Sequence, residues 1–400
     1  MKKGFAYFMI TAFVLFFSNT FAQDETEKEN TYQFTEIKEI PHTPVKNQYR
    51  SGTCWSFSGL GMLEAELIRE GKGEYDLSEM YIVRNAYSDK AKKYVRLHGN
   101  LNMAGGGGFS DDIYVMDNYG LVPEEVYSGK VIGEENHVHG EMDAVFKAYT
   151  DAVIKNKNRK LTPVWHDGFE SLLDAYLGEY PETFEYEGKE YTPESFDAEL
   201  GLNPDDYIEI TSYTHVPFYE HFIMQIPDNW MWSETYNVPM EEMMEIIDYA
   251  VDNGYTIAWG ADVSDKGFSW KNGVAIIPDT ETKDLSGTEK ERWEDLTEKE
   301  RKKAMYSFEE IVPEKEITQE MRQEAYNNYE TTDDHGMLIV GKAKDQNGNI
   351  YYKVKNSWGT EDHIYDGYLY VSKPYVAYKT MNFMLNKKAL PKDIRKKLAL

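Results

Sequence analysis

The sequence of 400 residues predicts an α+β protein, with helices in its N-terminal part and an antiparallel β-sheet in its C-terminal part. Apolar residues recur every three or four positions after residue 54, which is the spacing of one helix face. Short apolar or alternating runs follow residue 335 and are separated by a turn, which is typical of antiparallel strands. Hydrophobic residues make up 41% of the chain, enough for a sizeable core.

The first helix is predicted over residues 54–70, where Leu60, Leu63 and Leu67 share one face and Gly71 follows the end. A second helix is predicted over 111–119.

The next elements are less regular. The region 137–237 mixes periodicities and suggests only a hairpin over 184–191. A third helix over 240–253 is followed by a buried strand over 255–259. The interleaved lysines and glutamates of 289–303 indicate a solvated helical face.

Three strands are predicted near the C-terminus. Residues 337–340 are continuously apolar, 350–354 alternate, and 368–371 form a third apolar run. The Asp-Gln-Asn-Gly sequence at 345–348 is a turn between the first two runs. Together they predict an antiparallel sheet.

The N-terminus reads as a cleavable secretory signal over residues 1–22. Lys2 and Lys3 precede an apolar run over 5–17, and small residues follow before the chain turns acidic. The run is shorter than the roughly 20 residues that cross a bilayer as a helix. We therefore expect an exported protein, periplasmic or extracellular, that is not membrane-embedded.

Charge and cysteine content exclude several classes of protein. The formal net charge of −27 argues against nucleic acid as a partner. A single cysteine excludes disulfides within the chain and cysteine-rich metal sites. His137 and His139 have no evident third ligand, so we expect an exposed loop pair, no metal and no cofactor.

The lone cysteine, Cys54, stands at the start of the first predicted helix. The helix dipole there favours a thiolate, and a histidine partner can bring a thiol pKa from about 8.5 to roughly 3 to 4. The alternative is a buried, inert thiol.

His335 is the best candidate partner because it opens a buried strand. Asn356 has the same parity as Tyr352 and Val354 on the neighbouring strand, so its side chain can face inward. Its amide oxygen would accept one ring N–H and leave the other nitrogen for sulfur. Trp358 would shield that hydrogen bond from water.

Two further features suit acyl transfer. Gln48, six residues before Cys54, can aim its amide beside the backbone N–H of Cys54 as an oxyanion donor. The glycine run 105–108 offers bare backbone that can pair with an extended peptide, or it is simply a flexible loop.

Taken in order, these motifs resemble the papain-like cysteine peptidases. Their segments are Gln48-x5-Cys54-Trp55-Ser56-Phe57, His335-Gly336 and Asn356-Ser357-Trp358-Gly359. Three segments more closely resemble the bleomycin hydrolase and aminopeptidase C branch, namely Cys54–Ser58, Tyr119–Pro123 and Ser212–Tyr219. The similarity is spread from about Thr43 to the C-terminus.

The resemblance implies a papain-like two-lobed fold, with a peptidase domain over residues 23–400. Its parts would be a helical lobe over about 43–136, an insertion over about 137–237 and a β lobe over about 238–400.

The resemblance also implies roles for single residues. Cys54 would be the nucleophile, with His335 and Asn356 beside it, and Gln48 the oxyanion donor. The substrate-binding residues would be Gly106, Gly107, Trp358 and Leu400. In that branch the C-terminal carboxylate holds the substrate amine, which is the role expected of Leu400.

The sequence thus predicts an exported cysteine peptidase, an aminopeptidase that cleaves peptides through a thioester. A papain-like endopeptidase and an acyl-transferring or deamidating enzyme are alternatives, and a non-catalytic peptide-binding protein is an alternative of another class. Members of the branch are often hexameric, but this chain is shorter, so a homo-oligomer stays an open prediction.

Overall fold

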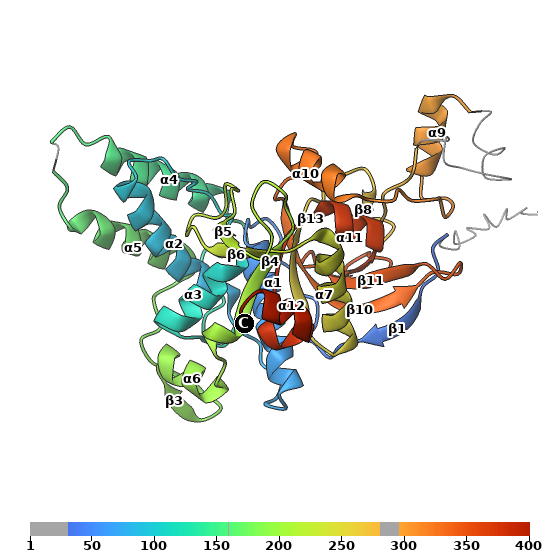
Figure 1. Ribbon diagram of the computed structural model, residues 1–400. Coiled ribbons are helices and arrows are strands. Elements are labelled where there is room, and N and C mark those ends of the chain that lie inside the picture. Colours follow the sequence, from blue (N-terminus) through green and yellow to red (C-terminus); the bar gives the residue numbers. More distant parts are fainter. Residues whose placement is uncertain (1–30, 159, 281–295) are drawn as a thin grey trace, which may run out of the picture.

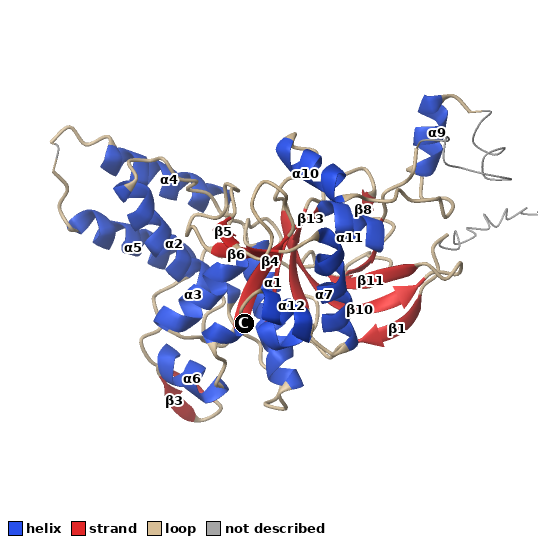
Figure 2. Cartoon of the chain, in the orientation of Figure 1, coloured by secondary structure: helices blue, strands red, loops and turns tan. Residues whose placement is uncertain are grey.

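The computed structural model describes residues 31–158, 160–280 and 296–400. The predicted signal segment 1–22 lies outside these ranges, as does part of the charged stretch 289–303. The helices between residues 79 and 200 gather on one side of the molecule, and the large sheet lies on the other side with the helices after residue 240 beside it (Figures 1 and 2).

The bounds of the elements are as follows. The helices are α1 Cys54–Arg69, α2 Glu79–Arg96, α3 Phe109–Tyr119, α4 Gly140–Ile154, α5 Val164–Leu177, α6 Pro193–Leu200, α7 Met240–Asp252, α9 Glu298–Met305, α10 Gln319–Asn327, α11 Lys373–Lys379 and α12 Lys392–Lys397. The strands are β1 Thr35–Glu39, β2 Phe184–Tyr186, β3 Lys189–Tyr191, β4 Tyr207–Thr211, β5 His221–Ile223, β6 Glu234–Asn237, β7 Ile257–Ala261, β8 Phe268–Ser269, β9 Val274–Ala275, β10 His335–Lys344, β11 Ile350–Lys355, β12 Tyr368–Ser372 and β13 Thr380–Asn386.

The large sheet has the strand order β5-β6-β4-β13-β7-β10-β11-β12-β9-β8, and β1 pairs with β10. The predicted C-terminal strands are confirmed, because β10, β11 and β12 pair antiparallel. A turn joins β10 to β11, where the Gly348 N–H donates to the Asp345 carbonyl at 3.0 Å. The sheet is mixed rather than purely antiparallel, since β4 pairs parallel with β6 and β12 with β9.

Strand β10 is buried on both faces. Leu338 and Val340 join the core shared with the N-terminal helices. Met337 and Ile339 join a second core, which α7 closes with Met243 and other apolar residues. This alternation follows from the two-residue period of a strand and sandwiches the sheet between two helical layers.

The middle of the chain is shared between both sides of the molecule. Helices α4 and α5 pack against α2 and extend the helical side. The predicted hairpin over 184–191 is confirmed as β2 and β3. Strand β4 pairs with β13 and carries the end of this region into the large sheet.

Within the ranges that the structure describes, no helix is both long and apolar enough to cross a bilayer.

Candidate active site

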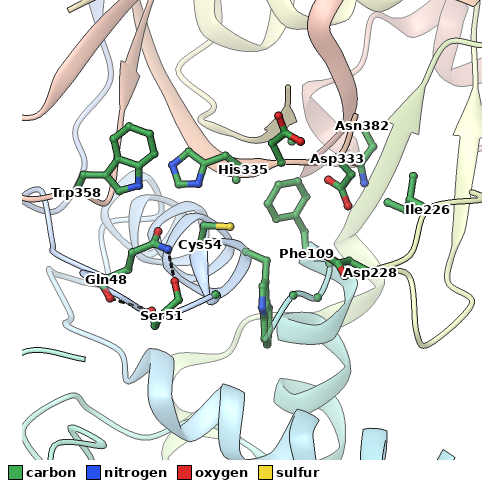
Figure 3. A pocket seen from close by; sticks show the side chains of 18 residues that line it. Gln48, Ser51, Cys54, Phe109, Ile226, Asp228, Asp333, His335, Trp358 and Asn382 are labelled. Carbon is green, nitrogen blue, oxygen red and sulfur yellow. Dashed lines mark hydrogen bonds between the residues drawn. The ribbon is translucent and has the colours of Figure 1, made fainter. Parts of the chain in front are cut away.

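A cleft of about 330 Å³ lies where the N-terminus of α1 meets the start of β10. Six of the eight residues proposed from the sequence line it, namely Gln48, Cys54, Gly106, Gly107, His335 and Trp358 (Figure 3). They come from segments far apart in the chain, so the fold alone brings them together. A cleft of this size is of the order that small-molecule and short peptide ligands occupy.

Gly336 allows β10 to approach α1 closely. A Cβ built at Gly336 would lie 2.7 Å from Ser58 Oγ and 3.3 Å from the Cys54 carbonyl oxygen. Any larger residue would push His335 away from Cys54. Cys54 is the first residue of α1, so its backbone N–H has no acceptor within the helix and is free to serve a ligand.

The orientation of the His335 ring is set by Asn356. Nε2 of His335 lies 2.7 Å from Asn356 Oδ1. The same oxygen accepts the backbone N–H of Ser357 at 2.8 Å, which fixes which amide atom faces the ring. Because an amide oxygen only accepts, Nε2 carries the proton and Nδ1 is left as the basic nitrogen.

Trp358 stacks on the His335 ring, with the centroids 4.7 Å apart and an interplanar angle of 29°. The indole therefore covers the imidazole, as expected from the sequence, and keeps water from this part of the site.

The Gln48 side chain is held at both of its polar atoms. Its Nε2 donates to the Ser51 carbonyl at 2.8 Å, and its Oε1 accepts from Ser357 Oγ at 2.6 Å. One N–H of the amide remains for a ligand at the cleft. Ser357 was not foreseen as a site residue, although its place directly after Asn356 was the available signal.

Two glycines of the run 105–108, Gly106 and Gly107, are required by close packing. A Cβ at Gly106 would lie 1.9 Å from Asp228 Oδ2, and one at Gly107 would lie 2.8 Å from the Trp55 ring. Lys90 lies beneath the run and donates to the carbonyl oxygens of Ala104 and Gly106 at 2.7 and 2.5 Å. It was not foreseen either, because nothing in the spacing of α2 distinguishes this lysine from its neighbours.

The low thiol pKa expected of Cys54 is not found in this structure. Burial raises the pKa of the thiol to about 12, and the charges of Asp333 and Asp228 add to the effect. The backbone N–H groups of Gly336 and Trp55 lower the pKa but do not outweigh burial. The Cys54 sulfur also forms no hydrogen bond with the imidazole of His335, and both residues are among those that the structure describes. No ion pair therefore offsets the loss of hydration that a thiolate would suffer in this buried position.

Burial acts on His335 in the opposite sense. It lowers the pKa of the imidazole to about 4, against the weaker raising effect of the hydrogen bond with Asn356. At neutral pH the ring is therefore uncharged, which is the form that can take a proton from a thiol.

Leu400 lies apart from the cleft and is not among its lining residues. It packs against the core beneath α7 and α12, and its N–H donates to the Arg395 carbonyl at 3.1 Å. The structure therefore does not bring the C-terminal carboxylate to Cys54. The role expected of Leu400 is corrected here, because the last turn of α12 ties the end of the chain to the opposite layer.

The prediction that His137 and His139 form an exposed loop pair is also wrong. Both rings are buried, and burial lowers the pKa of His137 to about 3 and that of His139 to about 4. Their backbones pair with Arg50 and so buttress the loop that leads to Cys54. Among the described residues, no group of three metal-ligating side chains is found.

Comparison with known proteins identifies the family. The model of the Peptidase C1-like family matches residues 15–292 and 287–399, which is nearly the whole chain. The chain belongs to this family. It is thus a cysteine peptidase by descent, and peptides are its substrate class.

Two relatives align with this chain over most of their own length. Aminopeptidase C of Lactococcus lactis subsp. cremoris is 23% identical over 397 residues, covering 89% of this chain and 83% of that protein. Aminopeptidase C of Lactobacillus delbrueckii subsp. lactis is 20% identical and covers 94% of this chain and 86% of its own.

A solved structure confirms the fold. The crystal structure of PepW from Lactobacillus rhamnosis HN001 matches with a TM-score of 0.65 and 18% identity, covering 91% of this chain and 84% of that one. The expected papain-like α+β architecture is therefore confirmed.

Proposed function

We propose that this chain is an aminopeptidase that cleaves peptides through a thioester on Cys54. The observation that carries the proposal is the convergence of Cys54, His335 and Gln48 on one cleft, with Asn356 orienting the imidazole. Two relatives that align over most of the chain are aminopeptidases C by name.

The chemistry follows from the positions of the hydrogen-bonding groups. Nδ1 of His335 accepts the thiol proton as the sulfur attacks the carbonyl carbon, so a C–S bond forms and the carbonyl π electrons move to oxygen. The resulting thiolate and imidazolium carry opposite charges and stabilise each other. Either charge alone would be unfavourable in the buried site. The backbone N–H of Cys54 and the free N–H of Gln48 are the donors for the oxyanion.

The second half of the reaction uses the same groups. The imidazolium gives its proton to the leaving nitrogen as the C–N bond breaks, and the thioester remains on Cys54. Neutral His335 then takes a proton from water, whose oxygen attacks the thioester carbonyl. The acid is released and the thiol is restored, so no cofactor is needed.

Export is part of the proposal. It rests on the two lysines and the apolar run at residues 2–17, which have the pattern of a secretory signal.

A matched pair of peptides tests the proposed activity. One carries a free N-terminus and the other an acetylated N-terminus on the same sequence. We expect single residues to be released from the free peptide and at least about tenfold slower cleavage of the acetylated one, because loss of a bound charged group typically costs that much. Product masses separate hydrolysis from acyl transfer. Equal cleavage of both peptides at internal bonds would indicate an endopeptidase and contradict the proposal.

A further inference from the structure

Three carboxylates line the cleft beside the candidate nucleophile, namely those of Asp228, Asp333 and Asp334. Among the described residues that line it, none is a lysine or an arginine. A peptide-binding cleft of this composition has a strongly negative wall, which suits a cationic part of the substrate.

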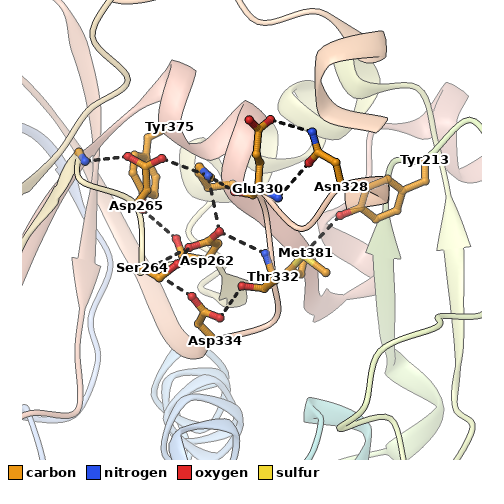
Figure 4. Close-up of polar contacts among 12 residues, drawn as sticks. Tyr213, Asp262, Ser264, Asp265, Asn328, Glu330, Thr332, Asp334, Tyr375 and Met381 are labelled. Carbon is orange, nitrogen blue, oxygen red and sulfur yellow. Dashed lines mark hydrogen bonds and ion pairs between the residues drawn. The ribbon is translucent and has the colours of Figure 1, made fainter. Parts of the chain in front are cut away.

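The three carboxylates differ in how they are already bound. Asp334 accepts from Thr332 Oγ1 at 2.7 Å and from the backbone N–H of Ser264 at 3.2 Å (Figure 4). The nearby cation Lys379 serves Asp262 and Asp265, at 3.5 and 3.2 Å. That network is therefore complete without a ligand.

Asp333 has no such support. Within the described ranges its carboxylate forms no hydrogen bond and no ion pair, although it lies in the cleft wall two residues before His335. Burial and the like charges of Asp228, Asp334 and Glu209 raise the pKa of Asp333 to about 7. A cation that enters the cleft therefore stabilises the unpaired, charged carboxylate of Asp333.

Asp228 faces the same space from a different element. Its carboxylate accepts from Asn102 Nδ2 at 2.6 Å and packs on the Cα of Gly106. Lys90 contributes a positive charge from below the glycine run, but it donates to backbone carbonyls and forms no ion pair with Asp228 in the described structure. Asp228 therefore also lacks a cation in direct contact.

The loop that carries Asp228 joins β5 to β6 and covers one end of the cleft. Ile226 and Asp228 lie on the side of Cys54 opposite to Trp358 (Figure 3). The loop is anchored to α3, because Trp230 Nε1 donates to Asp111 Oδ2 at 2.6 Å. A wall at this end limits how many substrate residues fit on the N-terminal side of the bond that is cut.

We propose that Asp228 and Asp333 together bind the α-ammonium group of the substrate's N-terminal residue. The proposal rests on the aminopeptidase function proposed above and names the residues that would restrict it. An ammonium group has three N–H donors and binds best where several oxygens converge. Two carboxylates from different elements, beside a wall that stops the chain, meet this requirement. They would take the role expected of the carboxylate of Leu400, which lies elsewhere.

The test compares Asp228→Asn, Asp333→Asn and the double variant with the wild type. The substrates are aminoacyl amides with a free or an acetylated amine and a neutral side chain. We expect KM for the free-amine substrate to rise about 10- to 100-fold in each single variant and further in the double variant, with kcat little changed. The slow cleavage of the acetylated substrate should stay as it is. Glu361→Gln removes an exposed carboxylate that does not line the cleft and should leave the ratio of the two substrates unchanged.

A second substrate pair identifies the source of the bound cation. An acetylated substrate with a lysyl side chain carries a positive charge but no α-ammonium. If the wild type prefers this substrate and the variants lose that preference, the carboxylates bind a basic side chain and the proposal is overturned. The proposal is also overturned if the double variant prefers the free-amine substrate over the acetylated substrate as strongly as the wild type does.

An affinity label keeps this inference separate from the proposed function. An aminoacyl chloromethyl ketone with a free amine alkylates Cys54 without turnover, and iodoacetamide reports the thiol without using the amine site. We expect the variants to react with the ketone at least about tenfold more slowly than the wild type. Their reaction with iodoacetamide should be as fast as that of the wild type or faster, because the charges of Asp228 and Asp333 raise the pKa of the Cys54 thiol and are removed in the variants. A wild type that cleaves no peptide would sink the proposed function, whereas unchanged ketone rates in the variants would sink only the ammonium site.

Discussion

Replacing Cys54 by alanine is expected to lower kcat for peptide hydrolysis by about 10⁴-fold or more, as removal of a covalent nucleophile does in other hydrolases. No other thiol can substitute, because Cys54 is the only cysteine of the chain. Steady-state hydrolysis of a free-amine peptide measures the effect. The cavity left by one sulfur atom is small, so the thermal unfolding temperature should change little.

Because the chain has a single cysteine, chemical labelling of the wild type supplies a control that needs no mutation. A thiol-specific reagent can modify only Cys54, so alkylation of the wild type should remove activity in step with the incorporated label. Activity that survives complete labelling, or that persists in Cys54→Ala, would show that the reaction uses another group.

Replacing His335 by alanine is the second change with a large expected effect. The variant loses the base that takes the thiol proton, so kcat should fall by about 10⁴-fold. Its thiol should also react slowly with iodoacetamide at pH 7. Burial raises the pKa of Cys54 to about 12, so the rate should rise as pH increases toward that value.

The wild type should follow a different pH course. Burial lowers the pKa of His335 to about 4, so the ring is neutral at pH 7 and can accept the thiol proton. Alkylation should therefore be faster than in His335→Ala at pH 7 and fall below about pH 4, where the ring is already protonated. His221→Ala, which changes an exposed histidine outside the cleft, is the matched control. Equal rates in the wild type and in His335→Ala would exclude His335 as the base.

Local patterns in the sequence predicted the helices and strands that carry the site. The helix after residue 54 depends on the spacing of Leu60, Leu63 and Leu67, and all three are fully buried in α1. The parity argument for Asn356 also holds, because its amide meets His335 across neighbouring strands. Such features depend on residues close in sequence or on the fixed two-residue period of a strand.

Features that depend on tertiary packing were not predictable in this way. The thiol pKa is set mainly by burial, which the position of Cys54 at a helix start does not reveal. Asp228 lies in a loop of the region for which no fold was predicted, and no motif marks it. The placement of Leu400 depends on how α12 packs against the core, which the last residues alone do not determine.

The most direct test of the central claim is to trap the covalent intermediate. Wild-type protein is mixed with an activated ester of an amino acid that has a free amine, quenched in acid within milliseconds, and its intact mass is measured. We predict a mass increase equal to one aminoacyl group, located on the peptide that contains Cys54 and absent from Cys54→Ala. Turnover of the same ester without any adduct, or an adduct on a different residue, would contradict the account.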